Sequence, residues 1–173
     1  MSTTIELVPY DPDWPRVFAA ERARLLQSTV LEQVEHVGST AVPGLTAKPT
    51  VDLMGGVRAL SAVDRAIGDF VALGYDYVTE FEDVMPERRY FRRPAERPRT
   101  HHLHVVEIGS PFWERHLAFR DWLRTHPEDA EAYAELKRQL AAVHGTDFMG
   151  YTDAKTAFIR RLEAVALRVR LGD

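Results

Sequence analysis

Residues 34–54 decide the fold, and they read VEHVGSTAVPGLTAKPTVDLM. Apolar and polar residues alternate over 34–37 as they do in a strand, and the small residues 38–40 then break that alternation. After a Pro-Gly pair, residues 50–54 predict a second short strand that contains Asp52. We therefore expect a small-residue turn, whose N–H and hydroxyl groups suit an anion, to lie beside a carboxylate.

The same stretch has a simpler interpretation. A strand, a glycine turn and a Pro-Gly loop are also how a chain changes direction, and a single Asp at a strand end is often a capping or solvated group. A lone Gly-Ser pair is too short to be a specific motif. On these residues alone, a phosphate or metal site and a plain turn both stay open.

A resemblance favours the site. The run His36-Val37-Gly38-Ser39-Thr40-Ala41-Val42-Pro43-Gly44-Leu45 resembles the signature of the GrpB-like family, which belongs to the nucleotidyltransferase-like superfamily. Other matching segments are 48–52, 101–106, 119–124, 126–127 and 151–155, and the likeness runs from Val8 to about Ile159. Related domains are fused to dephospho-coenzyme A kinase, which indicates nucleotide or coenzyme chemistry.

The fold class is predicted to be α+β, because mixed helices and strands are followed by helices. The elements expected are strands near 5–8, 75–79, 89–92 and 101–108, and helices that begin near Trp14 with Asp13 as cap, at Ser61, at Ser110, after His126-Pro127 and at Thr152. The resemblance implies a nucleotidyltransferase-like mixed β-sheet with packed helices and a helical C-terminal half, as one domain over 1–173.

Composition limits the partners. The chain has 173 residues with 22 basic and 26 acidic side chains, a net charge of −4, so no global basic field would hold nucleic acid. It has no cysteine, which excludes disulfides, cysteine zinc sites and thiol nucleophiles. No stretch approaches the roughly 18 apolar residues of a membrane span, and no signal segment is evident. We expect a cytoplasmic protein without a membrane partner.

The resemblance implies a two-metal site that this chain only partly supplies. In catalytic members of the superfamily, the Gly-Ser turn holds triphosphate, and an Asp-x-Asp pair with a third carboxylate binds two divalent metals. Here Asp52 is either the second acid, with Thr50 at the first position, or the first acid, with Met54 at the second. Either alignment removes a carboxylate, which argues against standard two-metal transfer.

Two histidines offer a partial replacement. Alternation places His102 and His104 on one face of their strand, and with Asp52 they would form a His₂-carboxylate set for Zn²⁺, Mn²⁺ or Fe²⁺. The alternative is that one histidine is a buried hydrogen-bonding residue and the other contacts phosphate. We predict Asp52, His102 and His104 as catalytic and metal-binding residues, with Mg²⁺ or Mn²⁺ as the cofactor and Zn²⁺ as the alternative.

Basic and small side chains complete the predicted site. Gly38, Ser39 and Thr40 are expected to contact phosphate, and Lys48, Arg120 and Lys155 to neutralise it. The alternative is a solvated charged face, and it is strongest for the arginine run over residues 88–93.

The leading hypothesis is a phosphate-binding cleft that performs nucleotidyl or phosphoryl transfer by positioning and charge stabilisation. The alternative is a non-catalytic module that binds a nucleotide or another anionic metabolite. A third interpretation is a scaffold that binds protein through its helical C-terminal half. The sequence names neither the nucleotide nor the acceptor, and it gives no oligomeric state.

Overall fold

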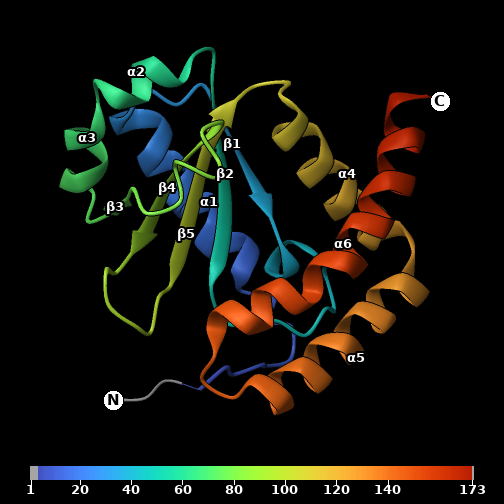
Figure 1. The fold of residues 1–173 in the computed structure, drawn as a ribbon. Helices are drawn as coiled ribbons and strands as arrows, with labels where there is room; N and C mark the ends of the chain where they lie inside the picture. The colour runs from blue at the N-terminus through green and yellow to red at the C-terminus, as the bar shows by residue number, and fades with distance from the viewer. Residues whose placement is uncertain (1–3, 173) are drawn as a thin grey trace.

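The computed structural model describes residues 4–172. Its centre is a five-stranded mixed sheet in the order β1-β2-β5-β4-β3 (Figure 1). The strands are β1 (Gln33–Val37), β2 (Val51–Val57), β3 (Asp76–Val78), β4 (Arg88–Arg93) and β5 (His101–Glu107). β2 and β5 run parallel, and the other neighbouring pairs are antiparallel. The predicted α+β class with a mixed sheet is confirmed.

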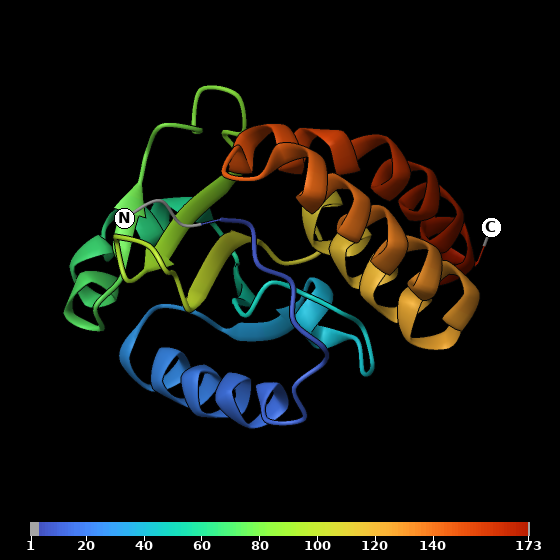
Figure 2. The ribbon, with the colours of Figure 1, turned by 90° about the horizontal axis from the view of Figure 1, so that it is seen from below.

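Helices cover both faces of the sheet. They are α1 (Trp14–Ser28), α2 (Leu60–Asp64), α3 (Ile67–Ala72), α4 (Pro111–Thr125), α5 (Pro127–His144) and α6 (Phe148–Leu171), with a 3-10 turn, η1, at Ser39–Ala41. Figure 2 shows α1 on one side of the sheet and the group α4 to α6 on the other. Within residues 4–172, no helix combines the length and apolar character that a membrane span needs.

The face toward α1 and α3 forms the main core. Leu53 of β2 and Leu103 of β5 are fully buried there with Leu25 of α1 and Phe70 of α3. Phe70 stacks on Phe91 of β4, with ring centroids 4.5 Å apart. Burying aliphatic and aromatic side chains of this size contributes roughly 1.5–3 kcal/mol each, so this face anchors the sheet.

The opposite face is only partly apolar. At one end, Met54 and Val106 pack against Phe112 and Trp113 of α4. A third cluster joins the loop after β1 to α4, α5 and α6 through Val42, Leu45, Leu123, Tyr133, Ala134 and Leu162. Between these clusters the face carries polar side chains. The first turns of α6 cross in front of one end of the sheet, and α5 lies beside it (Figure 1). The sheet therefore leaves a polar hollow under the helical C-terminal half.

Several local predictions need correction. The helix expected from Ser61 is two short helices, α2 and α3, and the strand expected at 5–8 is reduced to a single bridge between Val8 and Ala47. Asp13 makes no capping hydrogen bond because its carboxylate binds the Arg16 guanidinium instead. The helix start at Ser110 is confirmed, since its hydroxyl accepts the N–H of Trp113.

Candidate functional site

A cavity of about 390 Å³ opens on the polar part of the sheet. Its lining includes most of the residues predicted from the sequence, namely Gly38, Ser39, Thr40, Lys48, Asp52, His102, His104 and Lys155. They come together because β2 and β5 pair in register, Asp52 beside His102 and Met54 beside His104, so that the side chains of each pair share a face. Arg120 is the predicted residue that does not line this cavity.

Gly38 shapes the turn in two ways. Its φ of 72° lies in the left-handed region that glycine adopts without strain. A Cβ at this position would lie 2.5 Å from the Oδ2 atom of Asp52, closer than atoms can approach. The absence of a side chain at Gly38 therefore lets the carboxylate of Asp52 sit directly against the turn.

The other two turn residues differ in role. Thr40 is 1% exposed, and its hydroxyl shares a hydrogen bond of 2.9 Å with Nε2 of His36, so it braces the turn from inside. Ser39 is half-buried and lines the cavity with its hydroxyl. Of the two hydroxyls, that of Ser39 is the better placed to meet a ligand.

Asp52 is an ionised carboxylate that faces the cavity. Its side chain is 30% exposed, and its Oδ1 atom lies 3.1 Å from Nδ1 of His102. Burial alone would raise the pKa of Asp52, but the hydrogen bond to His102 and the positive charge of basic neighbours, among them Lys48, outweigh it and lower the pKa to about 2. At neutral pH, Asp52 carries a full negative charge among basic groups.

His104 is a neutral side chain beside a cation. Burial, followed by the charge of Arg88, holds its pKa well below the usual value. Its Nδ1 atom lies 3.3 Å from Nη1 of Arg88, and its ring stacks on Tyr90 with centroids 5.1 Å apart. A guanidinium at this distance opposes the binding of a metal cation to the same imidazole.

The predicted His₂-carboxylate metal site requires three donor side chains that point at one ion. Among residues 4–172, no three His, Asp or Glu side chains are placed to hold one metal ion together. Asp52 and His102 are already bonded to each other, and His104 faces Arg88. The donor set does not fit a His₂-carboxylate centre as it stands, and metal binding stays a prediction from the sequence.

Three lysines from different segments reach the cavity: Lys48 before β2, Lys137 in α5 and Lys155 in α6. Lys137 is 2% exposed, and its Nζ donates to Oγ of Ser39 at 3.0 Å and to the carbonyl of Thr46. Burial, followed by repulsion from neighbouring cations, lowers the pKa of Lys137 to about 7. Burial and the charge of Lys48 lower the pKa of Lys155 to about 8.

Aromatic rings lie next to several cations of the cavity. The Nζ atom of Lys155 lies 4.2 Å from the ring centroid of Tyr151, and that of Lys137 lies 4.7 Å from the ring centroid of Tyr133. The guanidinium of Arg88 lies 5.0 Å from the ring of Tyr90. Contacts of this kind partly replace the water that a buried cation loses.

The sequence interpretation missed Lys137 and Arg88. Lys137 lies one turn after Tyr133, on the apolar stripe of α5, and a lysine on that stripe was the available signal. Arg88 was grouped with a solvated arginine run. In that run Arg89 and Arg93 do pair with carboxylates, while Arg88 shares its face with the site.

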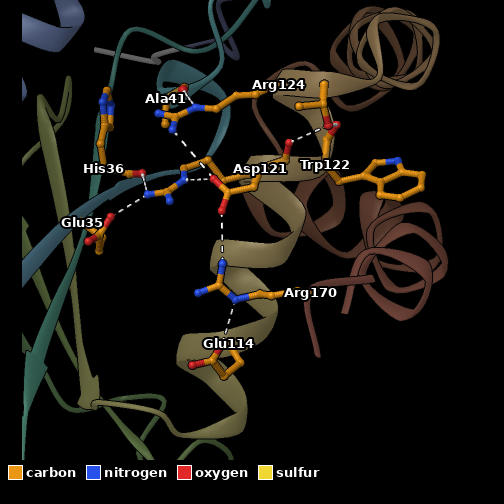
Figure 3. A network of polar contacts seen from close by, with 10 residues as sticks. Glu35, His36, Ala41, Glu114, Asp121, Trp122, Arg124 and Arg170 are labelled. Atoms are coloured by element: carbon orange, nitrogen blue, oxygen red, sulfur yellow. Dashed lines mark hydrogen bonds and ion pairs between the residues drawn. The ribbon is translucent and has the colours of Figure 1, made fainter. Parts of the chain in front are cut away.

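Arg120 lies in a different network, with Glu35, His36 and Asp121, which Figure 3 labels. Its Nη1 donates to Oε2 of Glu35 at 2.7 Å and to the carbonyl of His36, and its Nε donates to Asp121. Arg124 continues the network by donating to a carbonyl in η1. Arg120 therefore joins β1 to α4 outside the cavity described above, and its contact with a ligand stays a prediction from the sequence.

Fold and site together define an α+β protein with a cation-lined cleft on one face of a mixed sheet. Residues 4–164 match the family model described as GrpB protein, and the chain belongs to that family. It is 40% identical over 168 residues to a UPF0157 protein of Pseudomonas aeruginosa, covering 94% of this chain and 68% of that protein. It is 38% identical over 170 residues to the UPF0157 protein YqkA of Bacillus subtilis, with 97% of this chain covered, and it spans about half (49%) of that relative's length.

A solved structure supports the architecture. The crystal structure of conserved protein GrpB from Enterococcus faecalis superposes with a TM-score of 0.87 at 37% sequence identity, covering 96% of this chain and 99% of that one. A more distant relative is a dephospho-CoA kinase of Mycolicibacterium paratuberculosis, 27% identical over 181 residues, covering 90% of this chain and 44% of that protein.

Proposed function

We propose that the cleft binds the phosphate of a nucleotide or of another phosphate-bearing small molecule. The proposal includes the nucleotidyltransferase-like character of the fold that the sequence resemblance implies. The likeness to a dephospho-CoA kinase, whose name describes phosphate transfer to a coenzyme, is consistent with a ligand of this class. The observation that carries the proposal is the excess of positive charge in the cleft, where four cations, Lys48, Arg88, Lys137 and Lys155, accompany two carboxylates, Asp52 and Asp153.

Several half-buried arginines outside this cavity are matched by carboxylates. Examples are the pairs Arg89–Asp64, Arg93–Glu21 and Arg120–Glu35, whose N···O distances are 2.6, 2.9 and 2.7 Å. In contrast, Lys48, Arg88, Lys137 and Lys155 have no carboxylate within 4.0 Å in residues 4–172.

Unpaired cations in a partly desolvated hollow are costly, and they repel one another. A bound anion would remove both costs at once. Phosphate suits the arrangement because the Ser39 hydroxyl and the ammonium groups of Lys137 and Lys155 converge from separate elements on one space. Lys137 also fixes the orientation of the Ser39 hydroxyl, so the turn is organised before a ligand arrives.

The acid–base properties favour binding over general-base catalysis. A carboxylate with a pKa of about 2 is a weak proton acceptor at neutral pH, so Asp52 is better suited to orient a hydroxyl than to remove its proton. The second candidate, nucleotidyl or phosphoryl transfer, is favoured by the Asp52–His102 pair facing the same cavity. Transfer would depend on positioning and on charge stabilisation by the lysines.

A calorimetric titration with pyrophosphate and ATP tests the binding proposal. Hydrogen bonds to charged groups contribute about 1.5–3 kcal/mol, so Lys155→Gln should weaken binding by roughly tenfold or more. The matched control is Arg160→Gln, an exposed cation five residues further along α6, which should change the dissociation constant less than about twofold. The absence of binding to any of these anions would overturn the proposal.

Turnover separates the two candidates. Release of pyrophosphate or phosphate from ATP with Mg²⁺ or Mn²⁺, with water as the acceptor, would establish catalysis at this site if Asp52→Ala abolishes it. Binding of the same nucleotides without turnover, with and without EDTA, would establish a binding module. Zn²⁺ titration of the unliganded protein, followed by histidine NMR signals, tests the metal prediction in the same samples.

A further inference from the structure

We propose that the cleft takes a ligand with two anionic groups, one in the cavity described above and one in an adjoining lobe lined by Arg97 and Arg99. This inference rests on the proposed function and specifies its ligand class. The adjoining lobe has a volume of about 590 Å³. It shares Lys48, Thr50 and His102 with the first cavity.

Lys48 lines both lobes, and its side chain lies near aromatic rings of each. The Nζ atom of Lys48 lies 5.7 Å from the ring centroid of Phe148 and 5.5 Å from that of Tyr151, which lines the first cavity. The guanidinium carbon of Arg97 lies 3.5 Å from the same Phe148 ring. Lys48 is therefore positioned to contact an anion in either lobe, and the Phe148 ring lies close to both Lys48 and Arg97.

The loop between β4 and β5 carries Arg97 and Arg99 over this lobe. Thr50 holds the loop by donating from its hydroxyl to the carbonyl of Arg99 at 3.0 Å. The Nε atom of Arg99 is buried and has no hydrogen-bond partner among the described residues. A donor that is shielded from water and left without an acceptor is costly, and a ligand oxygen would satisfy it.

The second lobe, like the first, holds more positive than negative charge, because Lys48, Arg97 and Arg99 line it with one carboxylate, Glu6. Within residues 4–172, neither Arg97 nor Arg99 has a carboxylate within 4.0 Å, although Arg92 nearby is paired with Asp76 at 2.7 Å. Burial and then repulsion between neighbouring guanidinium groups lower the pKa values of Arg97 and Arg99. A single phosphate bound in the first cavity would leave the positive charges of Arg97 and Arg99 without an anion to compensate them.

The chemistry therefore points to a bisphosphate or polyphosphate ligand rather than a monophosphate. A ligand with two groups gains from both lobes without a second loss of translational freedom, which is the usual advantage of linked binding sites. Two arrangements share this chemistry: a continuous phosphate chain, and two phosphates separated by a sugar. The nucleotides ATP and adenosine 3′,5′-bisphosphate represent these arrangements, and AMP is the matched monophosphate.

The test compares dissociation constants of the three nucleotides for the full chain. We expect ATP, the bisphosphate or both to bind at least about tenfold more tightly than AMP. The double variant Arg97→Met, Arg99→Gln should remove this advantage and leave AMP within about twofold. Methionine at position 97 keeps apolar cover over Phe148, and thermal melting checks that the variant folds. Arg58→Gln, which alters an exposed ion pair remote from the cleft, is the control.

The outcomes separate this inference from the proposed function. AMP binding without any advantage for the other nucleotides would overturn the second lobe and leave the phosphate-binding cleft in place. The same holds if the double variant keeps the advantage for every nucleotide that shows one. Failure of all three nucleotides and of pyrophosphate to bind would overturn both. Loss of the advantage for only one of the two ligands identifies which phosphate arrangement the second lobe accepts.

Discussion

Replacing Lys137 with methionine should stabilise the unliganded protein while weakening anion binding. Lys137 is 2% exposed, has no carboxylate within 4.0 Å in the described chain, and lies in α5 beneath the cleft. Methionine has a similar length and fits an apolar environment. The substitution removes a desolvated charge, so its effects on stability and on binding should have opposite signs.

The expected change in the free energy of unfolding follows from the pKa of Lys137, which burial and the neighbouring cations lower from 10.5 to about 7. At about 1.36 kcal/mol per pKa unit, this lysine destabilises the folded state by about 4 kcal/mol at pH 7. The variant also loses the hydrogen bonds to Ser39 and Thr46, together worth about 2–3 kcal/mol. We expect a net stabilisation of about 1–2 kcal/mol.

The sign of the pH dependence provides a sharper check. Between pH 7 and 10.5 the unfolded chain binds more protons at Lys137 than the folded chain, so wild-type stability rises with pH in this window. At pH 9 the cost of the lysine falls to about 2 kcal/mol. The advantage of the variant should therefore shrink toward zero as the pH is raised from 7 to 9.

Urea unfolding at pH 7 and pH 9, followed by circular dichroism, measures both effects. Arg138→Met is the control on the same helix, because Arg138 makes only exposed ion pairs with Glu131 and Glu135 and should change stability by less than about 0.5 kcal/mol. Pyrophosphate titration should show that Lys137→Met binds roughly tenfold more weakly. A variant that is less stable than wild type at pH 7, or an advantage that does not change with pH, would refute the reasoning.

Three further outcomes are expected. Gly38→Ala should lose at least about 1–2 kcal/mol in urea unfolding, because its positive φ is unfavourable to alanine and its Cβ displaces the Asp52 carboxylate; unchanged stability would contradict this. His36 and His101 are buried with pKa values of about 4, against 6.5 when exposed, so each supports stability above pH 6.5 that is lost as the pH falls toward 4. An acid titration by circular dichroism should therefore show unfolding in that window, and His36→Gln or His101→Gln should flatten the pH dependence. Lys155, with a pKa of about 8, predicts that sulfate affinity measured by calorimetry falls as the pH rises from 6.5 to 9, and constant affinity would argue against its contact with the anion.

Local patterns predicted the parts of the site that lie along one strand or turn. Alternation correctly placed His102 and His104 on one face, and the break at Gly38 correctly located a turn. The contact between Asp52 and His102 depends on the pairing of β2 with β5. These strands are separated by about fifty residues, and the periodicity of each strand does not specify its partner. Lys137 was missed because its contact with Ser39 depends on where α5 packs in the folded chain.

Arg120 shows the limit of motif matching for the same reason. Its segment resembles the family pattern, yet helical spacing does not say whether a side chain of α4 points to the cleft or to the strand behind it. The observed ion pair with Glu35 shows that this arginine supports the architecture. The resemblance identified the family correctly. Which single side chains face the cleft became clear only from the hydrogen bonds and ion pairs that each one makes in the structure.

The distribution of charge also bears on which anions the cleft should select. The whole chain carries a net charge of −4, while the cations of the cleft lack carboxylate partners in the described residues. A duplex nucleic acid carries one charge per roughly 1.7 Å of its axis, so most of its phosphates would lie over the acidic remainder of the surface. A small phosphorylated molecule would place all of its charge among the lysines and arginines. We therefore expect the cleft to prefer small polyanions, because its positive potential is strong only within the cleft.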